Sequence, residues 1–221
     1  RDLAVRSKPF AARDLQELQA FAAEQGLSDL QSWDVGYYSE KLRQQRYSIS
    51  QEQVRAWFPI DKVLSGLFAI VEKLYGIQIK ELSGFDSWHP DVRLFEINEH
   101  GQHVARFFFD LYARANKRGG AWMDGARDQR RAANGELISP VANLVCNFTP
   151  AVNGQPALLT HDEVTTLFHE FGHGLHHLLT RVEHAGASGI NGVAWDAVEL
   201  PSQFMENWCW EPEGLALISG H

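Results

Sequence analysis

The sequence predicts a mainly α-helical protein with a small antiparallel β-sheet, an α+β fold. Apolar residues recur with the helical period in the first third of the chain and again after residue 160. Between residues 77 and 150, short segments instead alternate or run apolar over lengths typical of strands. The chain has 221 residues and is 44% hydrophobic, which is enough to bury a core. We expect a helical scaffold at 1–76, a small sheet and loop at 77–150, and further helices at 151–221.

The expected scaffold contains four helices. Residues 12–26 carry apolar side chains on one stripe and end at a glycine, a typical C-terminal stop. Residues 27–49 mix aromatic side chains with charges, and we interpret them as a long packed helix. Ser50 and Gln53 have the spacing of a capping box, which begins a short helix. Residues 60–76 repeat apolar side chains at the helical period and also end at a glycine.

The middle of the chain predicts the sheet. Residues 77–82, 92–99 and 103–112 have strand patterns, and "NEHGQH" between the last two supplies a hairpin turn. Residues 115–139 are glycine-rich and show little periodicity, so we expect a long loop, which in a compact domain often serves function. Residues 140–150, "PVANLVCNFTP", give one more strand between two prolines.

Composition excludes several classes of protein. The net charge of −8 argues against a nucleic-acid partner, because affinity for phosphate backbones comes mainly from clustered basic residues. The longest run of basic residues is interrupted, and we interpret it as a solvated loop: Lys117, Arg118, Arg127, Arg130 and Arg131.

Membrane insertion and disulfide bonding are not expected either. No apolar run approaches about 18 residues. Cys146 and Cys209 lie far apart in the sequence, which favours reduced thiols in the cytoplasm. The chain opens without an initiator methionine, so we expect a fragment of a longer protein. We also expect that protein to be a monomer in the cytoplasm with no membrane partner.

The stretch "TLFHEFGHGLHHL" concentrates histidines in a predicted helix. Thr160 and Glu163 form a second capping box, so this helix should begin at Thr160 and continue to about Arg181.

Two of these histidines have the spacing of a metal site. His169 and His173 are four residues apart, so both imidazoles project from one helix face and reach a single ion. Glu170 is rotated by about 100° from His169, which puts it beside the metal as a base instead of a ligand. The alternative, a polar face of an ordinary helix, is disfavoured because the whole H-E-x-x-H pattern is present.

A catalytic zinc site needs a third protein ligand and a free position for water. His176 lies about 10 Å along the helix from the first histidine of the motif, and the longer histidine motif would need a histidine where Leu179 stands. A carboxylate from a later element is therefore preferred. Glu199 and Glu206 both qualify, and spacing separates them only weakly. We interpret Glu183 as a solvated charge.

The segments "PALLTHDEVTTLFHEFGHGLHHLL" and "WDAVELPSQFMENWCWEPE" resemble the thimet oligopeptidase family of zinc metallopeptidases, as do "WDVGYYSEKLRQQRY" and "PVANLVCNFT". The resemblance implies that His169, His173 and Glu199 bind Zn²⁺ and that Glu170 is the general base. It implies a supporting role for Glu206 and leaves the remaining histidines of the helix without a role.

The resemblance also implies a fold and an activity. We expect a zincin-like metallopeptidase core that hydrolyses peptide bonds in short oligopeptides. Members of the family carry helical regions before and after this portion, including groups that stabilise the oxyanion. We therefore expect a fragment of a larger catalytic domain, weakly active or inactive by itself.

The expected mechanism is metal-assisted hydrolysis with Glu170 as the base. The alternatives are a non-catalytic zinc-binding helical scaffold, which would not need Glu170, an interaction module without metal, and a zinc aminopeptidase. Residues 143–149 could form a sheet edge that pairs with an extended peptide or a buried central strand, and the sequence leaves both open.

Overall fold

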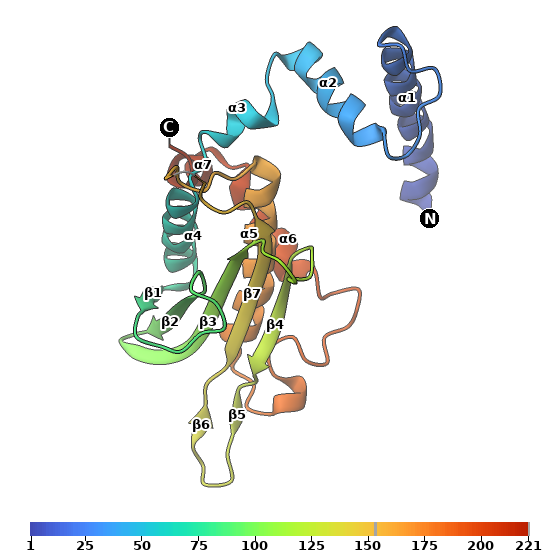
Figure 1. Ribbon diagram of the computed structural model, residues 1–221. Helices are drawn as coiled ribbons and strands as arrows, with labels where there is room; N and C mark the ends of the chain where they lie inside the picture. The colour runs from blue at the N-terminus through green and yellow to red at the C-terminus, as the bar shows by residue number, and fades with distance from the viewer. Residues whose placement is uncertain (153, 221) are drawn as a thin grey trace. The chain divides into compact units, whose positions relative to one another are not determined.

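The computed structural model describes residues 1–152 and 154–220. They form two compact units, Arg1–Val54 and Arg55–His221, which we describe separately (Figure 1). That both belong to one larger catalytic domain stays a prediction.

The first unit is helical. Helix α1 spans Asp2–Glu24, α2 spans Val35–Tyr47, and α3, Gln51–Arg55, crosses the boundary between the units. The long helix expected at 27–49 is shorter, because its first third forms turns in which the Asp34 carboxylate accepts a hydrogen bond from the Gln31 main chain. The predicted capping box before α3 is confirmed by reciprocal hydrogen bonds of 2.9 and 3.2 Å.

The second unit is built on a five-stranded sheet in the order β1-β2-β3-β7-β4. The strand bounds are Ile77–Leu82 for β1, Arg93–Glu99 for β2, Gln102–Tyr112 for β3, Trp122–Arg127 for β4 and Val141–Phe148 for β7. Strands β3 and β7 are parallel, and the other neighbours are antiparallel. The structure agrees with the predicted α+β class, but the expectation of a purely antiparallel sheet is wrong at the β3–β7 pair.

The segment expected as one long loop contains three strands: β4, β5 (Arg130–Arg131) and β6 (Leu137–Ile138). Strand β4 was not predicted, because most of its side chains are exposed and its sequence therefore shows no apolar alternation. It forms the edge of the sheet, while β7 lies between β3 and β4 (Figure 1). Of the two alternatives for residues 143–149, the central strand is therefore confirmed and the edge strand is wrong.

Helices pack on the sheet through a cluster of aromatic rings. Helix α4, Ile60–Tyr75, ends as predicted at a glycine with positive φ, and α5 spans His161–Leu178. The rings come from α4, β2, β3 and α5: Phe68, Phe95, Phe107, Phe109 and Phe171. The centroid distance between the rings of Phe107 and Phe171 is 5.3 Å. This packing fixes α5, which carries the histidine motif, against the sheet.

The chain ends in short helices: η1 (Ala185–Ala187), α6 (Leu200–Glu206), η2 (Asn207–Cys209) and α7 (Pro212–Ile218). Both cysteines, Cys146 and Cys209, are free thiols, as predicted, and both are buried. Burial raises the pKa of Cys209 to about 12. Within the described part of the chain, no helix combines the length and the apolar character needed to cross a membrane.

Candidate metal centre

Helix α5 begins where the sequence predicts. The Thr160 main-chain N–H donates to Glu163 Oε2 at 2.7 Å, and the Glu163 N–H donates to Thr160 Oγ1 at 3.1 Å. This capping box satisfies two otherwise free donors at the helix start. The helix ends at Leu178, three residues before the predicted end, and the whole histidine motif lies inside it.

His169, His173 and Glu199 converge on one point, with one ligand atom from each lying within 4.8 Å of the others. Glu199 Oε2 is 3.2 Å from Nε2 of His169 and 3.2 Å from Nε2 of His173. Ligands placed tetrahedrally at bond lengths of about 2.1 Å are roughly 3.4 Å apart. The spacing of these nitrogen and oxygen atoms therefore fits a zinc-sized ion.

Glu199 reaches the histidines because helix α6 starts very close to α5. A Cβ atom added to Gly172 would lie 2.6 Å from the Pro201 carbonyl oxygen, so a larger residue here would force α6 away from α5. The Ser202 hydroxyl, fully buried, lies 2.9 Å from Oε2 of Glu199 and holds this carboxylate in place. Sequence reasoning missed Ser202, because its role depends on which way the Glu199 side chain turns.

Glu206 orients the first histidine of the motif. Its Oε1 lies 2.6 Å from Nδ1 of His169. A carboxylate only accepts, so Nδ1 carries the hydrogen, and the lone pair of Nε2 faces the converging atoms. Burial lowers the pKa of His173, with the Glu199 carboxylate opposing the shift, which favours the neutral imidazole that a metal ligand requires.

Glu170 lies beside the converging atoms but is not one of them. It is only 7% exposed. Burial raises its pKa, the nearby Glu199 carboxylate adds to the rise, and His169 and a hydrogen bond from the Met123 main chain oppose it. It lines a cavity of about 350 Å³ together with Ala121, Thr165, Thr166, His169 and Glu206.

The other expected positions lie outside this cluster. His177 is fully buried, with Nε2 3.0 Å from the Arg127 carbonyl oxygen, so it joins α5 to β4. His176 is half-buried and is not among the converging residues. Glu183, interpreted as a solvated charge, lies outside the cluster, and its side chain is 38% exposed and pairs with Arg131.

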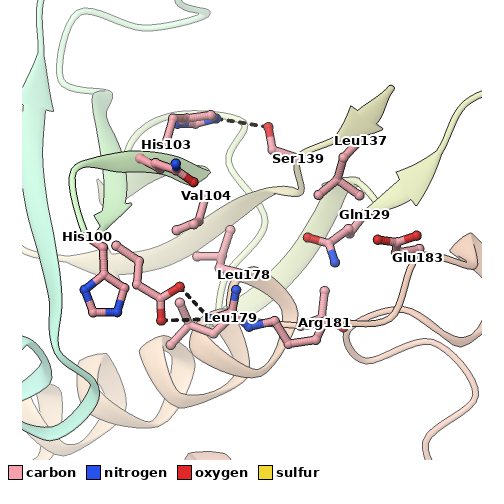
Figure 2. A pocket seen from close by; sticks show the side chains of 13 residues that line it. His100, His103, Val104, Gln129, Leu137, Ser139, Leu178, Leu179, Arg181 and Glu183 are labelled. Carbon is pink, nitrogen blue, oxygen red and sulfur yellow. Dashed lines mark hydrogen bonds and ion pairs between the residues drawn. The ribbon is translucent and has the colours of Figure 1, made fainter. Parts of the chain in front are cut away.

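A larger cavity of about 590 Å³ lies at the C-terminal end of α5 and shares no residue with the metal centre. Figure 2 shows that four of its polar side chains are paired with one another: His103 Nε2 is 3.0 Å from the Ser139 hydroxyl, and Arg181 donates to Glu99 at 2.7 Å. The larger cavity is usually the first candidate for an active site. Here the smaller one is lined by His169, one of the three converging residues, and by the buried carboxylate of Glu170, so we place the chemistry there.

Known proteins that are similar to this chain are peptidases. The profile of Peptidase family M3 matches residues 1–221. The chain is 62% identical to "Oligopeptidase A" of Escherichia coli K12 over 222 residues, which cover all of this chain and 33% of that protein. "Oligopeptidase A" of Haemophilus influenzae is 52% identical, over 99% of this chain and 32% of the relative. "Dipeptidyl carboxypeptidase" of Escherichia coli K12 is 37% identical, over all of this chain and 32% of the relative. The chain thus spans about a third of the length of these relatives.

Proposed function

The chain belongs to peptidase family M3, and from this premise we propose that it carries the zinc-dependent catalytic centre of an enzyme that hydrolyses short oligopeptides. The family membership expected from the motifs is thereby established. The single observation that carries the proposal is the convergence of His169, His173 and Glu199 beside the buried carboxylate of Glu170. The relatives named "Oligopeptidase A" support the choice of substrate class.

We propose that zinc is held by Nε2 of His169, Nε2 of His173 and a carboxylate oxygen of Glu199. Peptidases of this family are metal-dependent. Two imidazoles and one carboxylate are the donor set typical of hydrolytic zinc sites. When bound, zinc supplies a Lewis acid that polarises a carbonyl group and makes a water molecule more acidic. Glu206 and Ser202 hold two of the proposed ligands in their orientation through the hydrogen bonds described above.

Glu170 has the position and environment of a general base. A carboxylate whose pKa is raised by burial is a stronger base than a fully solvated one, so it accepts a proton from water more readily. We propose that Glu170 takes the proton of the attacking water and passes it to the leaving amine. A non-catalytic zinc scaffold would have no use for a buried carboxylate at this position.

Strand β4 offers a place for the substrate backbone. Among the described residues it pairs only with β7, which leaves its other edge available to an extended chain. Ala121, the residue before β4, lines the cavity with His169 and Glu170. We propose that an extended peptide lies along β4 with the bond to be cut next to Glu170. This replaces the edge role considered for residues 143–149.

We further propose a monomer in the cytoplasm with no nucleic-acid or membrane partner. The net charge of −8 supports the absence of a nucleic-acid partner, and the relative named "Probable cytosolic oligopeptidase A" of Arabidopsis thaliana, 42% identical over 31% of its length, supports the location. Removal of dipeptides from a C-terminus is a second candidate activity, favoured by the 37% identical relative named for it.

A chimera tests the proposed function. The matching segment of the Escherichia coli relative is replaced by this chain, and hydrolysis of an internally quenched peptide blocked at both ends is measured. We expect activity that Glu170→Gln abolishes and that Glu213→Gln, an exposed carboxylate in α7, leaves unchanged. Equal activity in Glu170→Gln and the unsubstituted chimera would contradict the assignment. If only peptides with a free C-terminus are cut, the second candidate activity is the correct one.

A further inference from the structure

Residues 113–121 connect β3 to β4. Their first half contacts a buried cluster of charged residues that has no part in the proposed chemistry. Asp110, 4% exposed, accepts bonds of 2.6 and 2.8 Å from Arg114 and one of 2.9 Å from Trp88 Nε1. Lys117 Nζ lies 2.9 Å from Oδ1 of Asp110 and 2.8 Å from the main-chain oxygens of Asp110 and Tyr112. The expectation that Lys117 belongs to a solvated basic loop is therefore wrong. The first half of the segment is fixed to the end of β3.

Asn147 of strand β7 fixes the second half. Its Nδ2 donates to the carbonyl oxygen of Arg118 at 2.8 Å and to that of Gly120 at 2.7 Å. An amide carries two hydrogens on nitrogen, so both are used. The last residue pair between β4 and β7 is Trp122 with Val145, and the same register continued by two residues would place Gly120 opposite Asn147. The Asn147 side chain thus supplies hydrogen bonds to this segment beyond the last residue pair between β4 and β7.

The residues that Asn147 holds would otherwise be poorly restrained. Gly119 and Gly120 are adjacent, and Gly120 has a φ of +94°, a conformation that L side chains rarely adopt. The next residue is Ala121, which lines the cavity with Glu170. Two residues later, the Met123 main chain lies beside the Glu170 carboxylate. A shift at Gly120 would therefore move Ala121 and the start of β4 relative to Glu170.

We propose that Asn147 is a positioning residue for the candidate active site: by holding the carbonyl groups of Arg118 and Gly120, it sets the place of strand β4 beside Glu170. Asn147 itself does not contact the reacting atoms. The inference rests on the proposed function, because it assigns to β4 the role of pairing with the peptide. It adds a residue outside the histidine motif whose substitution should change peptide binding without changing the metal ligands.

Hydrogen exchange tests the tether in the chain itself. Asn147→Asp keeps the shape of the side chain but loses both donors and places a negative charge beside two carbonyl oxygens. We expect the amides of residues 120–127 to exchange about tenfold faster or more in this variant. Asn98→Asp, the same change on strand β2 of the same sheet, is the matched control and should leave them unchanged. Unchanged exchange in Asn147→Asp would overturn the proposal.

The effect of Asn147 on peptide binding is measured as KM in the chimera described above, together with the zinc content. We expect Asn147→Asp to raise KM for an extended peptide about fivefold or more at unchanged zinc content and unchanged folded fraction. Asn147→Gln, which keeps the amide donors on a longer side chain, should recover part of the loss. A purely structural role predicts less folded protein at unchanged KM, and that result would overturn the proposal. Inactivity of the unsubstituted chimera would instead contradict the proposed function, and the exchange measurement would still decide whether Asn147 holds β4.

Discussion

Nδ1 of His169 lies 2.6 Å from Oε1 of Glu206, while Nε2 of the same ring lies 3.2 Å from Oε2 of Glu199. The two carboxylates stand at opposite ends of helix α6, Glu199 at its N-cap and Glu206 as its last residue. One short helix therefore supplies both a proposed ligand and the group that orients another ligand. The position of α6 against α5 decides the geometry of the whole centre.

The first prediction concerns the orienting carboxylate. Glu206→Ala removes the acceptor for the Nδ1 hydrogen of His169, so the ring is no longer held and its lone pair is no longer aimed. We expect zinc affinity to fall about 10- to 100-fold, as measured by competition with a chelating dye. Glu213→Ala, an exposed carboxylate nearby in sequence, serves as the control. Equal affinity in the two variants would show that His169 is oriented by its own packing.

The second prediction concerns the close approach of α5 and α6. Alanine at Gly172 would place its methyl group 2.6 Å from the Pro201 carbonyl oxygen, so α6 must move away. We expect Gly172→Ala to lower the free energy of unfolding by about 1–3 kcal/mol, although alanine favours helix, and to weaken zinc binding as well. Gly186→Ala has open space around the new methyl group and should change neither quantity. A stable Gly172→Ala variant with normal zinc affinity would contradict this account of the glycine.

The third prediction concerns pH and the buried cluster. Burial raises the pKa of Asp110, but hydrogen bonds from Arg114, Lys117 and Trp88 outweigh burial and hold the pKa well below its usual value. A depressed folded-state pKa contributes stability that is complete above the unfolded value of about 3.9 and is lost as pH falls toward the folded value.

We therefore expect Asp110→Asn to lower the free energy of unfolding at pH 7 by roughly 3–5 kcal/mol, because the buried Lys117 and the partly exposed Arg114 lose their partner. The difference from the unsubstituted chain should shrink as the pH of a urea titration is lowered below about 4. A difference that stays constant with pH would contradict this assignment.

The fourth prediction concerns the peptidase activity of the 221-residue chain by itself. It spans about a third of the relatives' length, and peptide hydrolysis also requires donors for the oxyanion and walls that position the substrate. We expect kcat/KM of the 221-residue chain on a short peptide to be at least about a thousandfold below that of the chimera. Near-equal values would mean that all essential groups lie within the chain.

Much of the fold can be predicted from local sequence patterns. The elements that could not be predicted share one cause, which is their dependence on pairing with distant residues. Helix α4 and strands β1 to β3 bury one face or both, so their periodicity is visible in the sequence. Strand β4 is an exposed edge with a glycine in its middle, and its existence depends on pairing with β7. Since β3 and β7 are separated by this unrecognised segment, their parallel pairing could not be anticipated either.

The residues of the candidate site also fall into two groups, those that local spacing predicts and those that depend on tertiary structure. His169, His173 and Glu170 are predictable because four-residue spacing on a helix is local geometry. Spacing could not choose between Glu199 and Glu206, and the structure gives the reason: both carboxylates contact His169, one at each ring nitrogen. The supporting contacts of the Ser202 hydroxyl, the Met123 main chain and the Asn147 amide depend on tertiary placement. No pattern in the sequence marks them.

The assignment of ligand and base roles is tested most directly by the zinc content of three forms of the chain after dialysis against a weak chelator. We expect one zinc ion per chain in the unsubstituted form and in Glu170→Gln, because Glu170 is not among the converging atoms. We expect none in His173→Ala, which removes a proposed ligand. Equal loss of zinc from Glu170→Gln and His173→Ala, or no zinc in the unsubstituted chain, would contradict the proposed centre.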